Sequence, residues 1–384
     1  MENSYSKIGI ILLFSIVLLG GGIYSVVKPD QAFSKLENRY LAEKPKWNQE
    51  EFLSGDWQMD YENYLNDQFP MRDRWVDIKT CTDRAMLKQD SGDVFYGKDD
   101  YLIEKYAEAD FDETMAEENI HFLTEFIKEM QQQYGEEHTL AMFVPGKANA
   151  MPKKLPPFAS PYDEQQTVNR ITQQVGKQTV LDVTDALQQH QQEYIYYRTD
   201  HHWTTLGAWY AYEQWAEKRG KTPIKKEECQ VESVTDNFYG TTYFKVHAKV
   251  PADTVELYHT PAEKQMKLRY NFSEEKDSIY DREKLKEQDK YQIFFGGNQP
   301  IVEMEMENKG KGTLLLLKDS YANCFVPFLT NHYSKIIMMD IRYLNSSIYQ
   351  FIGMYENEIT DVMTLYNVEK FLQEKNMWYL SKDI

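Results

Sequence analysis

A run of 20 uncharged residues, from Ile8 to Val27, constrains this chain more than any other feature. As a helix, such a run rises about 30 Å, which matches the hydrocarbon core of a bilayer. The run therefore predicts a short tail and a transmembrane anchor over residues 1–30, with the helix over about residues 8–27. A cleaved signal peptide is the main alternative, since Gly20–Gly22 would fit a cleavage region, and a buried core helix is the third. The short tail and the large part that follows favour a single-pass anchor in the cell membrane, with the body on the extracytoplasmic side.

The rest of the chain has the composition of a folded acidic protein. Of its 384 residues, 61 are Asp or Glu and 43 are Lys or Arg, which gives a formal net charge of −18. This charge, without a basic stripe, argues against nucleic-acid binding, because such binding depends on neutralising phosphates. Hydrophobic residues make up 42% of the chain, which excludes a largely disordered protein. The cysteines Cys81, Cys229 and Cys324 form no CxxC pair, no zinc-ligand spacing and no disulfide framework.

We predict two further segments after the anchor. Residues 31–90 are polar and aromatic and are expected to form a juxtamembrane stalk that leads into a first helix. Residues 91–384 alternate buried strands with helices, which predicts an α/β domain with a mostly parallel sheet and helices on both faces. Within it, the charged residues 251–310 are expected to form an irregular insertion or lid. The predicted strands are residues 140–144, 179–183, 194–197, 314–317, 336–339 and 362–366, and the predicted helices are residues 120–134, 168–175 and 204–218.

Two of the predicted strands end in side chains that carry chemistry. Asp200 and His202 follow strand 194–197, and Ser320 follows strand 314–317. Sites in open α/β sheets form beyond the carboxyl ends of the strands, so these two loops are expected to meet. A serine hydroxyl becomes a nucleophile when an imidazole takes its proton, and the imidazole needs a carboxylate that fixes its tautomer. The sequence therefore predicts a triad of Ser320, His202 and Asp200.

Each of these residues has other interpretations that spacing alone leaves open. Ser320 could be an ordinary helix cap, and His202 and Asp200 a surface pair. His201 could replace His202 as the base. Asp200, His201 and His202 could also bind a metal ion, although adjacent side chains rarely converge on one ion and no third ligand cluster is present in the sequence. Cys324 is a weaker candidate nucleophile, because one turn into a helix it is expected to lie in the core.

Seven short motifs occur in order along the chain. They are ENR (37–39), DQFPMRD (67–73), VPGKANAMP (144–152), TDHHW (199–203), FFGGNQP (294–300), LLLLKDSYANCFVPFL (314–329) and IIMMDIRY (336–343). Together they resemble the DHHW protein family, which is similar to the alginate O-acetyltransferase branch of SGNH hydrolases. The resemblance extends from about residue 31 to residue 384. It implies a three-layer α/β/α, SGNH-hydrolase-like (flavodoxin-like) domain that lies outside the cytoplasmic membrane and acts on acetyl groups of polysaccharides through a Ser-His-Asp triad.

The resemblance also assigns roles to individual residues. The family's Asp-x-His-Trp motif falls on Asp200, His202 and Trp203, which favours His202 over His201 as the base. The family's nucleophile falls on Ser320. The chain departs from the family pattern where Lys318 takes the place of the usual glycine, two residues before the nucleophile.

Further residues are candidates for binding substrate or an oxyanion. The backbone N–H groups of Ser320 and Tyr321 could point at the charge that develops in the transition state. Arg342 could add a cation, although a salt bridge to Asp340 explains it as well. Asn298 could add an amide donor, although it could simply be a turn residue. Lys147, in the loop after strand 140–144, could contact substrate.

We therefore expect a membrane-anchored, extracytoplasmic serine acyl-ester enzyme. The leading hypothesis is an O-acetyltransferase that acts on a cell-envelope or exported polysaccharide through an acetyl-Ser320 intermediate. A carbohydrate acetylesterase of the same fold is one alternative, and a catalytically silent module that binds glycan or scaffolds an assembly is another. No cofactor and no metal is expected. A transferase needs an acetyl donor outside the cell, which implies a multi-spanning membrane acyltransferase as its partner.

Overall fold

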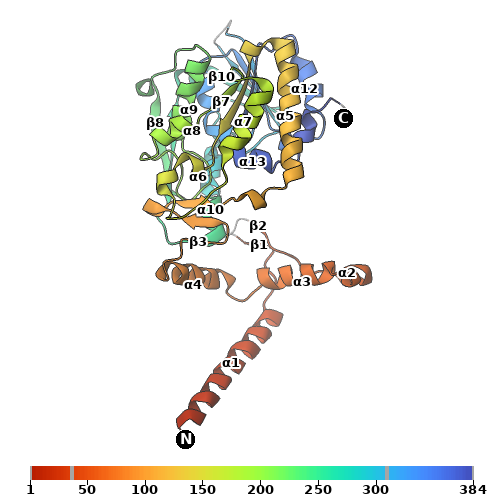
Figure 1. Ribbon diagram of the computed structural model, residues 1–384, viewed down its shortest axis with the longest axis vertical. Helices are drawn as coiled ribbons and strands as arrows, with labels where there is room; N and C mark the ends of the chain where they lie inside the picture. The colour runs from red at the N-terminus through yellow and green to blue at the C-terminus, as the bar shows by residue number, and fades with distance from the viewer. Residues whose placement is uncertain (1, 35–38, 308–310, 383–384) are drawn as a thin grey trace. The chain divides into compact units, whose positions relative to one another are not determined.

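The computed structural model describes residues 2–34, 39–307 and 311–382, and the chain divides into two compact units (Figure 1). The first unit comprises residues 1–88 and 244–249, and the second comprises residues 89–243 and 250–384. The residues of the predicted triad all belong to the second unit.

The first unit contains the N-terminal apolar helix. Its helices are α1 (Glu2–Val27), α2 (Gln49–Ser54), α3 (Asp56–Asp67) and α4 (Arg72–Ala85), and its strands β1 (Phe33–Ser34) and β2 (Arg39–Tyr40) form an antiparallel pair. Within the described residues, Lys7–Ser25 of α1 is the one helical stretch long and apolar enough to cross a membrane. Such a helix could be either a signal sequence or an anchor. After α1, Tyr64 of α3 donates a hydrogen bond to Asp30 (3.0 Å), and the side chain of Gln68 exchanges two hydrogen bonds of 3.0 Å with the backbone of Gln31.

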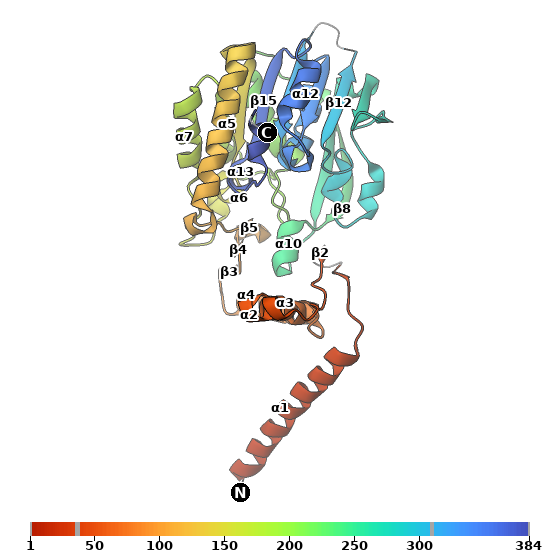
Figure 2. The same cartoon turned by 90° about the vertical axis from the view of Figure 1, so that its right-hand side faces the viewer.

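The second unit is an α/β fold built on a mixed, largely parallel sheet of eight strands (Figure 2). The strand order is β11-β10-β12-β14-β13-β15-β6-β7. Strands β14, β13, β15, β6 and β7 pair in parallel, and β12, β10 and β11 add an antiparallel edge. The strands of this sheet are β6 (Thr139–Val144), β7 (Val180–Asp182), β10 (Met266–Tyr270), β11 (Glu274–Lys276), β12 (Ile301–Met306), β13 (Thr313–Lys318), β14 (Lys335–Met339) and β15 (Asp361–Asn367).

The remaining strands of this unit form two smaller sheets. They are a three-stranded sheet of β3 (Asp90–Ser91), β4 (Val94–Tyr96) and β5 (Leu102–Glu104), and an antiparallel pair of β8 (Gln230–Phe238) and β9 (Asp253–His259).

Side chains of the central strands alternate between two hydrophobic cores, one on each face of the sheet. Leu314 and Leu316 of β13 belong to one core, and Leu315 and Leu317 belong to the other. The core of Leu314 is covered by α8 (Thr184–Gln189) and α9 (Thr205–Lys218), and the core of Leu315 by α5 (Glu113–Tyr134), α7 (Glu164–Val175), α12 (Ile348–Tyr355) and α13 (Val368–Leu372) (Figure 1). The remaining helices are α6 (Lys147–Ala150), α10 (Thr241–Val246) and α11 (Val326–Leu329).

The structure confirms five of the six predicted strands and corrects the sixth. Residues 194–197 form no strand; only Tyr196 makes an isolated bridge, to Trp203 in the following loop. The segment folds back on its own loop instead of joining the sheet, with Tyr197 N–H donating to the carbonyl of His202 (3.2 Å). The predicted helices are confirmed, and the side chain of Thr204 caps α9 as expected.

The expectation of an irregular insertion over residues 251–310 is wrong. This segment supplies β9, β10, β11 and β12, of which three belong to the main sheet. In β10, the buried Met266, Leu268 and Tyr270 alternate with exposed charged residues. This period of two is typical of a half-buried strand, but the charge of the surrounding segment obscures it.

Gly207 in α9 provides a test of how tightly this fold is packed. A Cβ at this position would lie 2.3 Å from the carbonyl oxygen of Ile195 and 3.2 Å from the Cβ of Trp203. We expect Gly207→Ala to lower the free energy of unfolding by about 1–3 kcal/mol, because the helix must move away from the loop. In the control Gly353→Ala on α12, the new Cβ meets nothing within 4 Å, and we expect a gain of about 0.5–1 kcal/mol. Denaturant unfolding measures both; equal effects of the two variants would contradict this packing.

Candidate active site

The predicted nucleophile stands at the carboxyl end of β13. Asp319 follows this strand and caps the short 3-10 helix η9 (Ser320–Cys324), since its carboxylate accepts a hydrogen bond from the N–H of Tyr321 (2.8 Å). The second carboxylate oxygen of Asp319 accepts a hydrogen bond from the N–H of Asn367 at the end of β15 (2.7 Å). The first bond closes the turn that follows β13, and the second ties this turn to β15. Ser320 is therefore fixed as the first residue of η9, and its side chain is half-buried.

A buried carboxylate shapes the loop that carries the predicted base. Asp253, at the start of β9, is fully buried. It accepts hydrogen bonds from the N–H groups of Arg198 (2.8 Å) and Thr199 (2.7 Å) and from the hydroxyl of Tyr194 (2.5 Å). An ionised carboxylate only accepts hydrogen bonds, so it suits a site with several donors. These bonds hold the start of the loop that follows residues 194–197.

The three residues of the predicted triad form one hydrogen-bonded row. His202 Nε2 lies 2.7 Å from Ser320 Oγ, and His202 Nδ1 lies 2.6 Å from Asp200 Oδ1. Because an ionised carboxylate only accepts, the neutral imidazole of His202 carries its proton on Nδ1, and its Nε2 accepts the hydroxyl hydrogen of Ser320. Asp200 also accepts the backbone N–H of His202 (2.9 Å), which fixes the loop between them. A hydroxyl, a base and an orienting carboxylate are thus in contact.

The second oxygen of Asp200 is held by the chain that follows β8. It accepts hydrogen bonds from the N–H (2.8 Å) and the hydroxyl (3.1 Å) of Thr241. Gly240 packs on this carboxylate so closely that a Cβ there would lie 2.2 Å from the Cβ of Asp200. Burial alone would raise the pKa of the Asp200 carboxyl, but its interactions with His201 and His202, including two hydrogen bonds from His202, outweigh burial and hold this pKa well below its usual range. Asp200 is therefore ionised.

Tyr291 contacts both the predicted base and the predicted nucleophile. Its ring stacks on the imidazole of His202, with centroids 4.0 Å apart and planes inclined by 13°. Its hydroxyl donates to the backbone carbonyl of Ser320 (3.0 Å) and lies 3.4 Å from the sulfur of Cys324. Burial raises the pKa of the Tyr291 hydroxyl well above its usual range, so this group remains a neutral donor.

Lys318, at the position where a glycine is usual, has a fully buried side chain. Its ammonium lies 3.1 Å from a carboxylate oxygen of Asp340 and donates to the amide oxygens of Asn298 and Asn323, each at 3.0 Å. Because an ammonium can only donate, Asn298 must present its oxygen to Lys318, and its NH₂ group is turned the other way. Burial lowers the pKa of the Lys318 ammonium, and the charge of Asp340 opposes this effect.

Trp203 and Tyr321 connect the two loops of the site. The indole N–H of Trp203 donates to the carbonyl of Tyr321 (2.9 Å), and the hydroxyl of Tyr321 donates to the carbonyl of His201 (2.7 Å). The backbone N–H of Tyr321 is bound to Asp319, so it is not available as the oxyanion donor that the sequence suggested. Both side chains are buried, and they hold the loops together.

Lys147 and Arg342, the other candidate substrate contacts, are engaged inside the protein. Lys147 is buried and donates to the carbonyl of Leu102 (2.7 Å). Burial lowers the pKa of the Lys147 ammonium to about 8. Arg342 makes two hydrogen bonds with the carboxylate of Asp340, at 2.8 and 2.6 Å, which is the salt bridge that the sequence offered as its plainer explanation.

The arrangement opposes both a cysteine nucleophile at Cys324 and a metal ion bound to His202. Burial raises the pKa of the Cys324 thiol to about 12, so this cysteine is protonated and unsuited to act as a nucleophile. The ligand atoms of Asp200, His201 and His202 lie within 4.8 Å of one another, close enough for a metal ion. Both ring nitrogens of His202 are already engaged, however, with Asp200 and Ser320. A metal bound to His202 would have to replace one of these bonds.

A family model matches part of the chain. Residues 166–339 match the model of a family described as DHHW protein. Over these residues the chain is similar to that family. The matched region contains Asp200, His202 and Ser320. No curated protein matches the chain.

Solved structures share the fold of the second unit. A DHHW family protein from Eubacterium siraeum is 26% identical to the chain, with a TM-score of 0.60, over 75% of this chain and 93% of its own. Bacillus cereus PatB1, solved with a sulfonyl adduct, is 19% identical, with a TM-score of 0.59, over 75% of this chain and 100% of its own. The O-acetyltransferase domain of Pseudomonas putida AlgJ matches with 13% identity and a TM-score of only 0.43, over 73% of this chain and 92% of its own, and we draw no conclusion from it.

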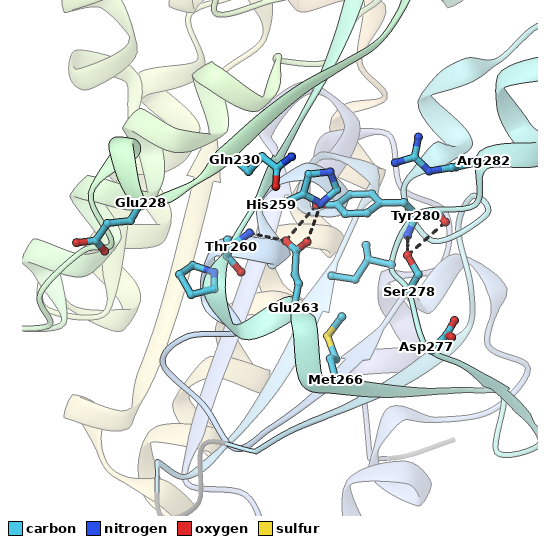
Figure 3. A pocket seen from close by; sticks show the side chains of 12 residues that line it. Glu228, Gln230, His259, Thr260, Glu263, Met266, Asp277, Ser278, Tyr280 and Arg282 are labelled. Carbon is cyan, nitrogen blue, oxygen red and sulfur yellow. Dashed lines mark hydrogen bonds and ion pairs between the residues drawn. The ribbon is translucent and has the colours of Figure 1, made fainter.

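A pocket of about 400 Å³ lies beside β9, and the triad residues do not line it (Figure 3). At its wall, His259 bridges two carboxylates, with Nε2 2.9 Å from Glu232 and Nδ1 3.2 Å from Glu263. The hydroxyl of Tyr280 donates to Glu263 (3.1 Å), and Arg282 pairs with Glu232 (2.7 Å). The polar groups of this wall thus bind one another, which indicates a structural ion-pair network.

The loop of residues 199–203 is expected to depend on Asp253. In Asp253→Asn, an NH₂ group replaces one carboxylate oxygen and faces the N–H and O–H groups that had donated hydrogen bonds to that oxygen. We expect a loss of about 2–4 kcal/mol in the free energy of unfolding, because buried donors lose a charged partner. The matched control is Asp236→Asn on β8, where the side chain is exposed and the effect should stay within about 0.5 kcal/mol. Thermal unfolding of both variants measures this; a silent Asp253→Asn would contradict the role of the carboxylate.

The ion-pair network of His259 predicts a pH dependence of stability. Hydrogen bonding to Glu263 raises the pKa of the His259 imidazole above its usual value. A raised pKa in the folded state stabilises the protein fully below the unfolded value of about 6.5, and this contribution is lost as pH rises through the folded pKa. We expect His259→Gln to cost up to about 1 kcal/mol at pH 6 and little at pH 9, as measured by urea unfolding. A cost that grows with pH would contradict this sign.

Proposed function

We propose that this chain is a serine acyl-ester enzyme that transfers acetyl groups through an acetyl-Ser320 intermediate. One observation carries the proposal: hydrogen bonds of 2.7 and 2.6 Å join the hydroxyl of Ser320, the imidazole of His202 and the carboxylate of Asp200. Nucleophile, base and orienting group stand in the order that acyl transfer to a serine requires.

The chemistry takes two half-reactions. In the first, Ser320 Oγ attacks the carbonyl carbon of an acetyl ester while its proton moves to His202 Nε2, and Asp200 stabilises the imidazolium. The tetrahedral intermediate collapses when the leaving alkoxide takes this proton, which leaves acetyl-Ser320. In the second, an incoming hydroxyl gives its proton to His202 and its oxygen attacks the acetyl carbon; the bond to Ser320 Oγ then breaks, and His202 returns the proton to Oγ.

Two donors suit the oxyanion that forms in each step. Ser320 is the first residue of η9, where a helical N–H has no intrahelical acceptor. Lys318 and Asn323 both donate to the amide oxygen of Asn298. Its amide nitrogen makes no hydrogen bond within the described part of the chain. We assign the oxyanion to these two groups, since donors oriented before the reaction stabilise the charge that develops in the transition state. Lys318 then serves to orient Asn298.

The proposed acceptor is a hydroxyl group of a cell-envelope or exported polysaccharide. The support is the resemblance of the motifs to the alginate O-acetyltransferase branch of SGNH hydrolases, which also suggests a three-layer SGNH-hydrolase-like domain. We propose that α1 is an uncleaved single-pass anchor in the cell membrane and that the second unit lies on its extracytoplasmic side. An acetyl donor is then needed outside the cell, for which we propose a multi-spanning membrane acyltransferase as partner.

Loss of the nucleophile is the first test of this function. We expect Ser320→Ala in the full chain to lower kcat/KM for p-nitrophenyl acetate by at least about 1,000-fold, because the covalent route is gone. We expect Asp200→Asn to lower it by at least about 100-fold, because the amide no longer fixes the reactive tautomer of His202. The matched control is Ser278→Ala, an exposed serine on the pocket of Figure 3, which should keep the rate of the parent.

Covalent labelling gives a second readout. PatB1 has been solved with a sulfonyl adduct, so a sulfonyl fluoride is a suitable probe. We expect it to label the parent and Ser278→Ala at Ser320, and to leave Ser320→Ala and His202→Ala unlabelled. An unlabelled parent, or a Ser320→Ala variant with the rate of the parent, would refute the enzyme and favour the silent glycan-binding module.

A further inference from the structure

His201 stands beside the triad, and the proposed mechanism leaves it without a task. Its Nδ1 lies 2.7 Å from the hydroxyl oxygen of Thr241 and 3.7 Å from Asp200 Oδ1. Its ring lies against that of His202, with centroids 3.9 Å apart and planes inclined by 36°. The side chain of His201 is 17% exposed, against 7% for His202, so it is the more accessible of the two imidazoles.

The hydrogen bonds of Thr241 determine which nitrogen of His201 carries the proton. The Thr241 hydroxyl has one hydrogen and donates it to Asp200 Oδ2, because an ionised carboxylate can only accept. The Thr241 oxygen therefore accepts its other hydrogen bond from the Nδ1–H of His201. With the proton on Nδ1, the Nε2 of a neutral His201 is a bare acceptor.

The same contacts determine the direction in which this Nε2 points. Both imidazoles turn their Nδ1 atoms toward the carboxylate of Asp200, and their rings lie against each other with planes inclined by 36°. Each Nε2 therefore lies on the side of its ring away from Asp200. The Nε2 of His202 meets Ser320 Oγ there, and we infer that the Nε2 of His201 faces the same side of the site.

The surroundings of His201 keep it neutral. Burial lowers the pKa of the His201 imidazole well below its usual range, and the neighbouring His202 lowers it further. When His202 takes a proton during the reaction, its positive charge opposes protonation of His201 still more. His201 is therefore suited to accept a hydrogen bond throughout the reaction, and not to act as a second acid.

We propose that His201 Nε2 accepts a hydrogen bond from a hydroxyl next to the one that is acetylated, so that the two imidazoles together bind a vicinal diol. This deepens the proposed function and rests on it. The oxygen of the attacking hydroxyl bonds to the acetyl carbon while its proton moves to His202, and the bond from that carbon to Ser320 Oγ breaks as His202 returns the proton to Oγ. The neighbouring hydroxyl keeps its proton and donates it to His201, which holds the sugar in place. The preferred acceptor is thus a sugar with two adjacent free hydroxyls.

The test compares acceptors on the full chain, with p-nitrophenyl acetate as acetyl donor. We expect the KM of the parent for a methyl glycoside to be about threefold to tenfold lower than for monodeoxy analogues in which a neighbour of the acetylated hydroxyl is missing, the effect of one hydrogen bond. Equal KM values would overturn the inference without any variant. This comparison also stands if a variant fails to fold.

Variants at position 201 add a second readout. His201→Phe keeps a ring but has no acceptor, and we expect it to abolish the preference for the diol and to lower the ratio of transfer to hydrolysis by about threefold to tenfold. His201→Gln carries an amide oxygen and should restore part of this preference. The matched control is His190→Phe, a histidine that pairs with Glu193 on the surface and should keep the ratio of the parent.

The outcomes separate this inference from the proposed function. A parent that a sulfonyl fluoride fails to label at Ser320 would refute the enzyme itself. A labelled parent in which His201→Phe retains the diol preference, or in which His201→Gln and His201→Phe lose it equally, would refute the role of His201 alone.

Discussion

The carboxylate of Asp200 is the group on which the rest of the candidate site depends. It is 1% exposed and accepts four hydrogen bonds, two from His202 and two from Thr241. A buried carboxylate without such partners would cost several kcal/mol, so the charge and its donors hold one another in place. Because this charged carboxylate only accepts hydrogen bonds, the neutral imidazoles of His201 and His202 carry their protons on Nδ1 and accept hydrogen bonds at Nε2. The ionised state of Asp200 therefore orients His202 directly and His201 through Thr241.

The fold brings these groups together from distant parts of the chain. Ser320 is fixed by a turn that is tied to β13 and β15, whereas the loop of His202 is fixed by the carboxylate of Asp253. The charged segment 251–310 supplies Asp253, and it also supplies Tyr291, which stacks on His202. This segment is part of both the sheet and the site.

The sequence predicted what local patterns can encode. Four consecutive leucines at 314–317 indicate a strand buried on both faces, and a serine, a histidine and an aspartate after strand-like segments indicate a shared edge. The partners of the triad could not be predicted in this way. Asp253 and Tyr291 lie among many acidic and aromatic residues, and their roles arise from contacts between distant segments. The strand expected at 194–197 failed for the same reason, because Asp253, from a distant segment, binds the hydroxyl of Tyr194 and the N–H groups of Arg198 and Thr199 that follow the expected strand.

The most direct test of the proposed chemistry is whether Ser320 carries an acetyl group during turnover. The full-length protein can be mixed with an activated acetyl ester, quenched in acid while ester is still being consumed, and digested for peptide mass spectrometry. We predict one acetyl group on the peptide that contains Ser320, assigned to that side chain by fragmentation, and its absence when His202 is replaced by Ala. Ester consumption without acetyl on Ser320, or with acetyl on a different side chain, would contradict the account.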